Sequence, residues 1–284
     1  MCTVTFLPLP GGGYLLGSNR DERADRPPAR PPEAWDAGAA RALAPVDAAA
    51  GGTWLAADDR GRSLCVLNGD RGLVESRDDA PSRGLLVRAL MEDPTPDGVW
   101  RRLEARAAEG ALRENPFKLL VAAPGEDGAP AAAEVVEWDG RELARRPCPA
   151  PGVVVSNGFD AEGVAERRRA AFAELAERAA ELAAPGATAD EGAEALADTL
   201  AEVQLRWHAS HRGAETADGA RHGDTSSVCM HREEVSSVSF TRVRVGADTV
   251  AMDHVAGQPC RAGPAVTATL PRVASAPDED LHAP

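Results

Sequence analysis

A glycine-rich turn near the N-terminus most constrains how this chain can fold. Residues 1–6 and 15–22 are both typical of strands, and residues 10–13, Pro-Gly-Gly-Gly, lie between them. Such residues favour a tight turn, so the two runs should form a hairpin. Because the turn fixes the register, paired residues should have numbers that sum to roughly 22–24. The spacing therefore predicts that Cys2 faces the charged run at residues 20–22.

Cys2 directly follows the initiator methionine. A small second residue normally allows the cell to remove Met1, which leaves a cysteine with a free α-amine. That amine can act as the base for its own thiol, as in an N-terminal nucleophile. In this arrangement Arg20 would favour the thiolate and Asp21 would hold the amine. The alternative is that Cys2 is a small buried hydrophobic residue beside a solvated strand end.

Three motifs follow one another in the first part of the chain. They are Met-Cys-Thr-Val-Thr-Phe at 1–6, Ser-Asn-Arg-Asp-Glu at 18–22 and Gly-Gly-Thr-Trp-Leu-Ala at 51–56. With these motifs the chain resembles the NRDE family, also called the transport and Golgi organisation 2 (TANGO2) family, over most of its length. That family is similar to N-terminal nucleophile hydrolases of the penicillin V acylase and bile salt hydrolase type. The resemblance implies an αββα fold and a processed N-terminal cysteine.

The remaining pattern predicts an α+β protein. Further strands are expected at 53–57, 63–68, 117–123, 134–138, 152–156, 226–231, 235–245 and 249–253, and helices at 81–92, 97–109, 161–183 and 188–207. Alternating groups of strands and helices suit two packed sheets covered by helices. The resemblance implies the specific form, a four-layer αββα sandwich of the N-terminal nucleophile hydrolase type.

Domain boundaries follow from the distribution of core-forming residues. We expect a single domain over residues 1–273 and a disordered tail over 274–284, because the tail lacks core-forming residues. Residues 25–32 contain four prolines, so they should form an extended surface connection.

The composition argues against several functions. The chain has 284 residues and a net charge of −14, so it should repel nucleic-acid phosphates and anionic membranes. No apolar stretch approaches the ~18–20 residues that span a bilayer, and no signal-peptide pattern is present. We therefore expect a cytoplasmic protein without nucleic-acid binding or membrane insertion. Five cysteines without CxxC spacing argue against a disulfide framework, and Cys65 and Cys229 are expected in the core.

Two asparagines end strand-like runs, in Asn68-Gly69 and Asn157-Gly158. Asn-Gly is a common turn pair, so both can be explained by turn geometry alone. Amide cleavage, however, needs neutral donors that point at the developing oxyanion. Because the related acylases use asparagines in comparable places, the resemblance implies that Asn68 and Asn157 hold the oxyanion or orient the substrate.

Four histidines occur in or near a polar, glycine-rich stretch. They are His208, His211, His222 and His231. Residues 208–224 are expected to form a mobile loop, and no cysteine or carboxylate stands at a ligand-like spacing from these histidines. The sequence therefore predicts solvated histidines, with no metal and no cofactor.

The predicted function is an N-terminal cysteine amidohydrolase or acyltransferase. Its substrate would be a small acylated amide, and the reaction would pass through an acyl-thioester on the cysteine. The predicted catalytic residues are Cys2, Arg20, Asp21, Asn68 and Asn157. The alternative is a non-catalytic binding or carrier protein for haem or lipid, in which Cys2 or a loop histidine ligates haem iron. Substrate identity and oligomeric state are left open.

Overall fold

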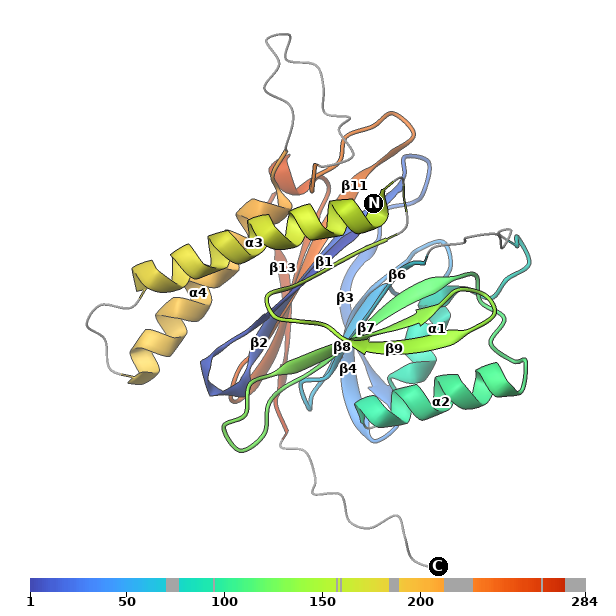
Figure 1. Cartoon of the computed structure of the whole chain (residues 1–284), viewed down its shortest axis with the longest axis horizontal. Coiled ribbons are helices and arrows are strands. Elements are labelled where there is room, and N and C mark those ends of the chain that lie inside the picture. Colours follow the sequence, from blue (N-terminus) through green and yellow to red (C-terminus); the bar gives the residue numbers. More distant parts are fainter. Residues whose placement is uncertain are drawn as a thin grey trace, which may run out of the picture.

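Two antiparallel sheets lie against each other in the computed structural model, and two helices cover the outer face of each (Figure 1). The structure describes residues 1–69, 77–93, 95–156, 158, 160–183, 189–211, 227–261 and 263–273. The segment predicted to be a disordered tail, 274–284, and most of the predicted loop at 208–224 lie outside these residues.

The first sheet places the N-terminal strand in its interior. Its strands run in the order β10 (Gly152–Val155), β1 (Thr3–Pro8), β2 (Tyr14–Arg23), β11 (Val235–Val245), β12 (Thr249–Ala256) and β13 (Val266–Pro271). The β1–β2 connection contains the short 3₁₀ helix η1 (Pro10–Gly12). Gly12 in this turn has a φ of 79°, and a Cβ there would lie 2.7 Å from the Gly125 carbonyl oxygen. Glycine is therefore required at this position, which explains how the sequence sets the hairpin register.

The second sheet is a meander in chain order. It contains β3 (Arg30–Ala37), β4 (Ala40–Val46), β5 (Leu55–Asp58), β6 (Ser63–Asn68), β7 (Phe117–Ala123), β8 (Ala132–Trp138) and β9 (Leu143–Pro147). The proline-rich segment was predicted as a connection, but β3 begins inside it at Arg30. Pro31 and Pro32 are tolerated because β3 is an edge strand whose pairing with β4 shifts between Arg30 and Glu33.

Each sheet packs helices on one face and the other sheet on its opposite face. Helices α1 (Arg83–Leu90) and α2 (Pro96–Ala108) cover the seven-stranded sheet, and α3 (Ala161–Ala183) and α4 (Ala189–His208) cover the six-stranded sheet. Between the sheets, Phe6 and Val243 from one contribute to the same core cluster as Leu55 and Leu120 from the other. The predicted αββα sandwich is thus confirmed. No helix in the described part of the chain is long and apolar enough to cross a membrane.

One predicted strand is not formed. Residues 226–231 were expected to open a three-stranded meander, but the described part of this segment makes an isolated bridge between His231 and Ser236. The backbone here bonds elsewhere, since Cys229 N donates to the Ser210 carbonyl and Met230 N donates to Ser237 Oγ. The meander is formed by β11, β12 and β13.

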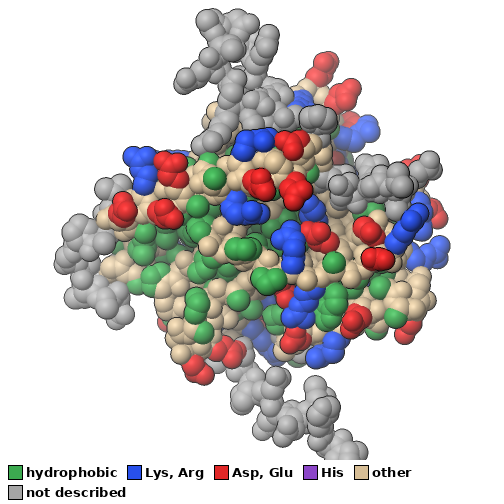
Figure 2. Space-filling model, viewed as in Figure 1, with side chains coloured by type: hydrophobic (Ala, Val, Ile, Leu, Met, Phe, Trp, Pro, Cys, Tyr) green, Lys and Arg blue, Asp and Glu red, His purple; other side chains and the backbone are tan. Residues whose placement is uncertain are grey.

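The molecular surface carries charges of both signs. On the face drawn in Figure 2, Lys and Arg side chains lie among Asp and Glu side chains. Some of them form exposed pairs, such as Arg146 with Glu137 at 2.8 Å. Exposed pairs of this kind contribute little to stability individually, so the fold depends mainly on its three apolar clusters.

A buried tyrosine connects the two sheets. The Tyr14 hydroxyl of β2 donates to the Gly61 carbonyl at 2.6 Å and lies 2.7 Å from Ser63 Oγ of β6. Tyr14→Phe keeps the ring but leaves the Gly61 carbonyl without this donor. We expect the free energy of unfolding to fall by about 1–3 kcal/mol in urea titrations. Thr199→Val, which removes an exposed helical hydroxyl, is the control and should change stability by less than about 0.5 kcal/mol. Equal stability of Tyr14→Phe and the parent would contradict this expectation.

Candidate functional site

The observed hairpin register brings Cys2 beside the charged run. Thr3 pairs with Asn19 and Thr5 pairs with Gly17, so the partners' numbers sum to 22, as predicted. Cys2 Sγ accepts a hydrogen bond from the Asp21 backbone N–H at 3.3 Å. On the other side, the Cys2 carbonyl accepts from Ser156 N at 3.0 Å. Cys2 is therefore fixed between β2 and the residue that follows β10.

Asp21 joins the chain terminus to the sheet. Its Oδ2 lies 2.9 Å from the terminal nitrogen of Met1, and its side chain is only 2% exposed. Its Oδ1 accepts a hydrogen bond from Ser237 Oγ at 2.5 Å. Burial raises the pKa of the Asp21 carboxyl, while the terminal ammonium and the Ser237 hydroxyl act in the opposite direction. The terminus and Asp21 thus form a buried ion pair.

Ser237 is a residue that sequence reasoning missed. It lies opposite Asp21 at an irregularity in β11, where the pairing with β2 shifts between Ser237 and Ser239. Its hydroxyl also accepts a hydrogen bond from Met230 N at 2.9 Å. Such irregularities redirect side chains, and here the result is a fixed donor to the carboxylate. No local pattern could have shown this contact, because Ser237 and Asp21 are 216 residues apart.

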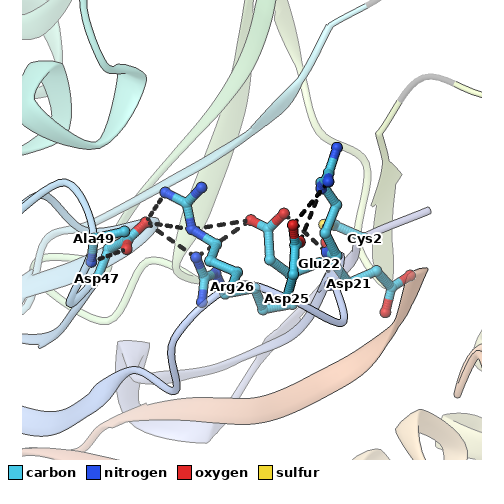
Figure 3. Close-up of polar contacts among 9 residues, drawn as sticks. Cys2, Asp21, Glu22, Asp25, Arg26, Asp47 and Ala49 are labelled. Carbon is cyan, nitrogen blue, oxygen red and sulfur yellow. Dashed lines mark hydrogen bonds and ion pairs between the residues drawn. The ribbon is translucent and has the colours of Figure 1, made fainter. Parts of the chain in front are cut away.

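Arg20 belongs to a network that extends away from the thiol. Its Nη2 lies 3.0 Å from Asp47 Oδ2 and 3.3 Å from Glu22 Oε2, and its guanidinium stacks 4.5 Å from the centre of a Trp54 ring. Figure 3 shows Asp47 at one end of this network and Cys2 at the other, with Arg26 and Glu22 between them. Burial would raise the pKa of Asp47, but its bonds to Arg26 and Ala49 N and the charge of Arg20 lower it on balance.

The thiol is protonated in the chain that retains Met1. The pKa of Cys2 is raised to about 11, first by burial and second by the Asp21 carboxylate, whereas the terminal ammonium lowers it. The expected stabilisation of the thiolate by Arg20 is not among the main influences on this pKa, because Arg20 is engaged by Asp47 and Glu22. That role of Arg20 therefore stays a prediction.

A hollow of about 430 Å³ opens beside Cys2. Both sheets contribute to its lining, since Arg20 and Asp21 belong to β2 and Asn68 belongs to β6, and Cys2 and Trp54 line it as well. The volume falls within the range of small-molecule sites. The structure thus brings four of the five predicted catalytic residues to one hollow.

Of the two predicted asparagines, the structure describes only Asn68. Asn68 is exposed at the last position of β6 and lines the hollow. Asn157 lies outside the described residues, although Ser156 bonds to Cys2 and a Cβ on Gly158 would collide with the Met1 side chain. Their assignment as oxyanion donors stays a prediction.

His208 is not a solvated loop residue, as the sequence had suggested. It is the last residue of α4 and fully buried, and its Nε2 lies 2.9 Å from Thr5 Oγ1. Burial, with a smaller contribution from Arg168, lowers the pKa of His208 to about 3. A neutral histidine therefore packs against the N-terminal strand. Its backbone carbonyl accepts from Asn19 Nδ2 at 2.8 Å, so Asn19 secures this segment.

Arg168 of α3 is a second residue that the sequence did not indicate. It is almost fully buried, and its guanidinium donates to Thr3 Oγ1 and to the Ser227 carbonyl. Its charge also acts to lower the pKa of Asp21. Arg168 thus connects the helical layer, the N-terminal strand and the segment that follows residue 226.

Comparison with known proteins gives one family match and several structural likenesses. The model of the family described as transport and Golgi organisation 2, TANGO2, matches residues 1–234. No curated protein matches the chain.

Among solved structures, the chain is similar to a Caenorhabditis elegans N-acylethanolamine-hydrolyzing acid amidase ortholog, with 9% identity and a TM-score of 0.38 over 85% of this chain and 92% of that one. It is also similar to two variants of the conjugated bile acid hydrolase from Clostridium perfringens. One has 13% identity and a TM-score of 0.40 over 89% of this chain and 88% of the other. The second has 11% identity and a TM-score of 0.43 over 98% and 100% of the two chains.

The environment of Cys2 predicts slow alkylation while Met1 is present. A thiol pKa of about 11 instead of 9.0 leaves about a hundredfold less thiolate at neutral pH. Protein from cells with inhibited methionine aminopeptidase should react with iodoacetamide at Cys2 at a rate that rises with pH towards 11, as measured by peptide mass spectrometry.

The Asp21→Asn variant tests the cause of this shift. Removing the carboxylate removes one of the influences that raise the pKa, so Cys2 should react faster at pH 8 than in the parent. Asp25→Asn, an exposed change of the same charge, is the matched control. A rate that already levels off near pH 9 in the parent would contradict the expectation.

Proposed function

The chain belongs to the transport and Golgi organisation 2 family, and we propose that it is an N-terminal cysteine amidohydrolase or acyltransferase acting on a small acylated amide. One observation carries the proposal. Asp21 lies between the thiol of Cys2 and the chain terminus, because its backbone N–H donates to Cys2 Sγ and its carboxylate lies 2.9 Å from the terminal nitrogen of Met1, one residue before the α-nitrogen that removal of Met1 would free. A solvated strand end would not require a buried carboxylate at this place.

The proposed reaction begins with removal of Met1, which makes Cys2 the first residue. The free α-amine of Cys2 takes the thiol proton, and Sγ attacks the acyl carbonyl of the substrate. The tetrahedral intermediate then collapses to a thioester as the α-ammonium returns the proton to the leaving nitrogen. Water, or an acceptor amine in a transferase, attacks the thioester carbonyl and releases the acyl group from Sγ.

The surrounding charges support these steps. The terminal ammonium lowers the pKa of the Cys2 thiol even from residue 1, and removal of Met1 moves that charge onto the cysteine itself. Asp21, held by Ser237, would fix the α-amine beside the sheet. A reducing cytoplasm suits this chemistry, because it keeps the Cys2 thiol free.

The substrate-binding roles proposed for Arg20 and Asn68 rest on their position at the hollow. Arg20 is held by Asp47 and Trp54 and lines the same hollow as Cys2. In the proposal its positive charge favours the thiolate or binds a polar group of the substrate. Asn68, which lines the same hollow, and Asn157 would donate hydrogen bonds to the oxyanion.

Substitution of Cys2 tests the nucleophile. Protein purified from its own host should lack Met1 by intact mass, and incubation with a panel of small N-acyl amides should give an acyl adduct on Cys2. Cys2→Ala should lose both the adduct and all turnover, whereas Cys2→Ser should keep a slow turnover. Cys148→Ala, which removes a buried thiol of the central core, should keep full turnover.

Two results would contradict the proposed function. One is Met1 retained in the mature protein, and the other is unchanged turnover in Cys2→Ala. A Soret shift on adding haem, without any acyl adduct, would instead favour a carrier on the same scaffold.

Replacement of Asp21 tests the residue that holds the amine. Asp21→Asn preserves the shape of the side chain but removes the charge that pairs with the terminus. We expect kcat to fall by about 10²–10⁴-fold, the usual range for disturbed acid–base catalysis. The acid limb of the plot of kcat against pH should also shift. Asp25→Asn removes an exposed charge just beyond the end of β2 and should leave kcat unchanged. Equal losses in both variants would point to a general charge effect and would count against this role of Asp21.

A further inference from the structure

A second cluster of chemically active side chains lies outside the hollow. It contains His211, Cys229, His231 and Cys260, whose candidate ligand atoms all lie within 4.8 Å of one another. They come from three segments, since His211 follows α4, Cys229 and His231 precede β11, and Cys260 lies in the 3₁₀ helix η2 (Pro259–Arg261). Only folding brings them together.

The distances within the cluster resemble those of a metal site. His231 Nε2 lies 3.4 Å from Cys229 Sγ and 3.1 Å from Cys260 Sγ. The rings of His211 and His231 meet edge to face, with centroids 4.8 Å apart. In a tetrahedral zinc site with Zn–S of about 2.3 Å and Zn–N of about 2.0–2.1 Å, neighbouring sulfur and nitrogen ligands lie roughly 3.6 Å apart. The two distances from His231 are therefore within about half an ångström of the spacing in a zinc site, and all four ligand atoms lie within 4.8 Å of one another.

Backbone contacts already hold the ligands in place. His211 Nδ1 lies 3.0 Å from the Cys229 carbonyl oxygen. Metal-binding histidines typically donate one ring N–H to a carbonyl in this way, which directs the other nitrogen at the metal. Cys229 N also donates to the Ser210 carbonyl at 3.0 Å. These bonds join the segment after α4 to the segment before β11 beside the four side chains.

We propose that His211, Cys229, His231 and Cys260 bind one zinc ion in a structural Cys₂His₂ site. Thiolate and imidazole ligands together favour zinc over the hard cations that prefer oxygen. Four protein ligands fill a tetrahedral shell, so the ion has no open position for substrate and acts as a structural crosslink. The spacing of these residues in the sequence did not indicate the site, because Cys260 reaches His231 across 29 residues of sequence.

The position of the cluster gives the ion a definite role. Met230, between two of the ligands, is bonded through its backbone N–H to Ser237, which in turn donates to Asp21. Its sulfur lies 3.6 Å from the terminal nitrogen of Met1. A zinc ion here would fix the wall against which the N-terminus packs. The site is argued from its own geometry and does not depend on the proposed hydrolytic activity.

Metal content and cobalt substitution test the proposal on the full chain. Elemental mass spectrometry should find one zinc ion per chain in protein that is purified with reductant and without chelator. Replacement of zinc by Co²⁺ should give the visible absorption of tetrahedral cobalt, with a thiolate-to-cobalt band in the near ultraviolet. Removal of the metal should lower the melting temperature, and adding Zn²⁺ alone should restore it.

Substitution of one ligand locates the site. Cys260 is exposed, so Cys260→Ser should fold, and it should weaken zinc binding at least tenfold in competition with a chromophoric chelator. Cys148→Ser, which changes a buried cysteine outside the cluster, should bind zinc as the parent does. If Cys260→Ser does not fold, the cobalt spectrum and the number of zinc ions per parent chain decide whether the site binds metal.

Two results would overturn the proposal. One is a parent chain that, kept reduced, has no zinc and no tetrahedral cobalt spectrum. The other is a folded Cys260→Ser variant that binds zinc as tightly as the parent.

Discussion

The ion pair between Asp21 and the chain terminus is the constraint that the rest of the site depends on. A carboxylate that is almost fully removed from water is unstable unless a cation and hydrogen-bond donors compensate it. The terminal ammonium supplies the cation, and Ser237 supplies the donor. Both partners must be held at fixed positions. The interior position of β1 and the irregularity of β11 where it passes Asp21 both meet this requirement.

The sandwich architecture then produces the hollow. Cys2 precedes β1 and Arg20 lies in β2 of the six-stranded sheet, while Trp54 directly precedes β5 and Asn68 ends β6 of the seven-stranded sheet. Side chains from both inner faces fill the centre, where Phe6 and Leu120 belong to one cluster. At the edge of this core the two sheets present polar and charged groups to each other. Arg20 lies at the boundary between the apolar core and this polar edge, because its guanidinium contacts carboxylates and also stacks on Trp54.

Local patterns predicted the parts of the fold that depend on local chemistry. The turn at residues 10–13 set the β1–β2 register, and helix α3 has the predicted bounds, Ala161–Ala183. Strands β3, β4, β9 and β13 were not predicted, and for β9 the reason is clear. Strand β9 is mostly exposed and carries Arg145 and Arg146, so it lacks the apolar run that marks a buried strand.

The parts of the site that could not be predicted all depend on distant segments. Ser237, Arg168 and His208 reach the N-terminal hairpin through contacts that span more than 160 residues of sequence. Cys260 approaches His231 only because β12 returns the chain to that end of the sheet. The residue types gave no signal, since an isolated serine, arginine or cysteine is common anywhere. The hairpin residues were predictable because their contacts are close in sequence.

The interior position of β1 also sets an order of events during synthesis. The terminal nitrogen of Met1 is enclosed by Asp21 and Met230, and the Met1 side chain packs against Gly158. An aminopeptidase must take that terminus into its own active site, which the folded sheet prevents. The enclosing strand β11 begins only at Val235, so it leaves the ribosome long after the first residues. Removal of Met1, which the proposed function requires, would therefore have to act on the growing chain before the sheet is complete.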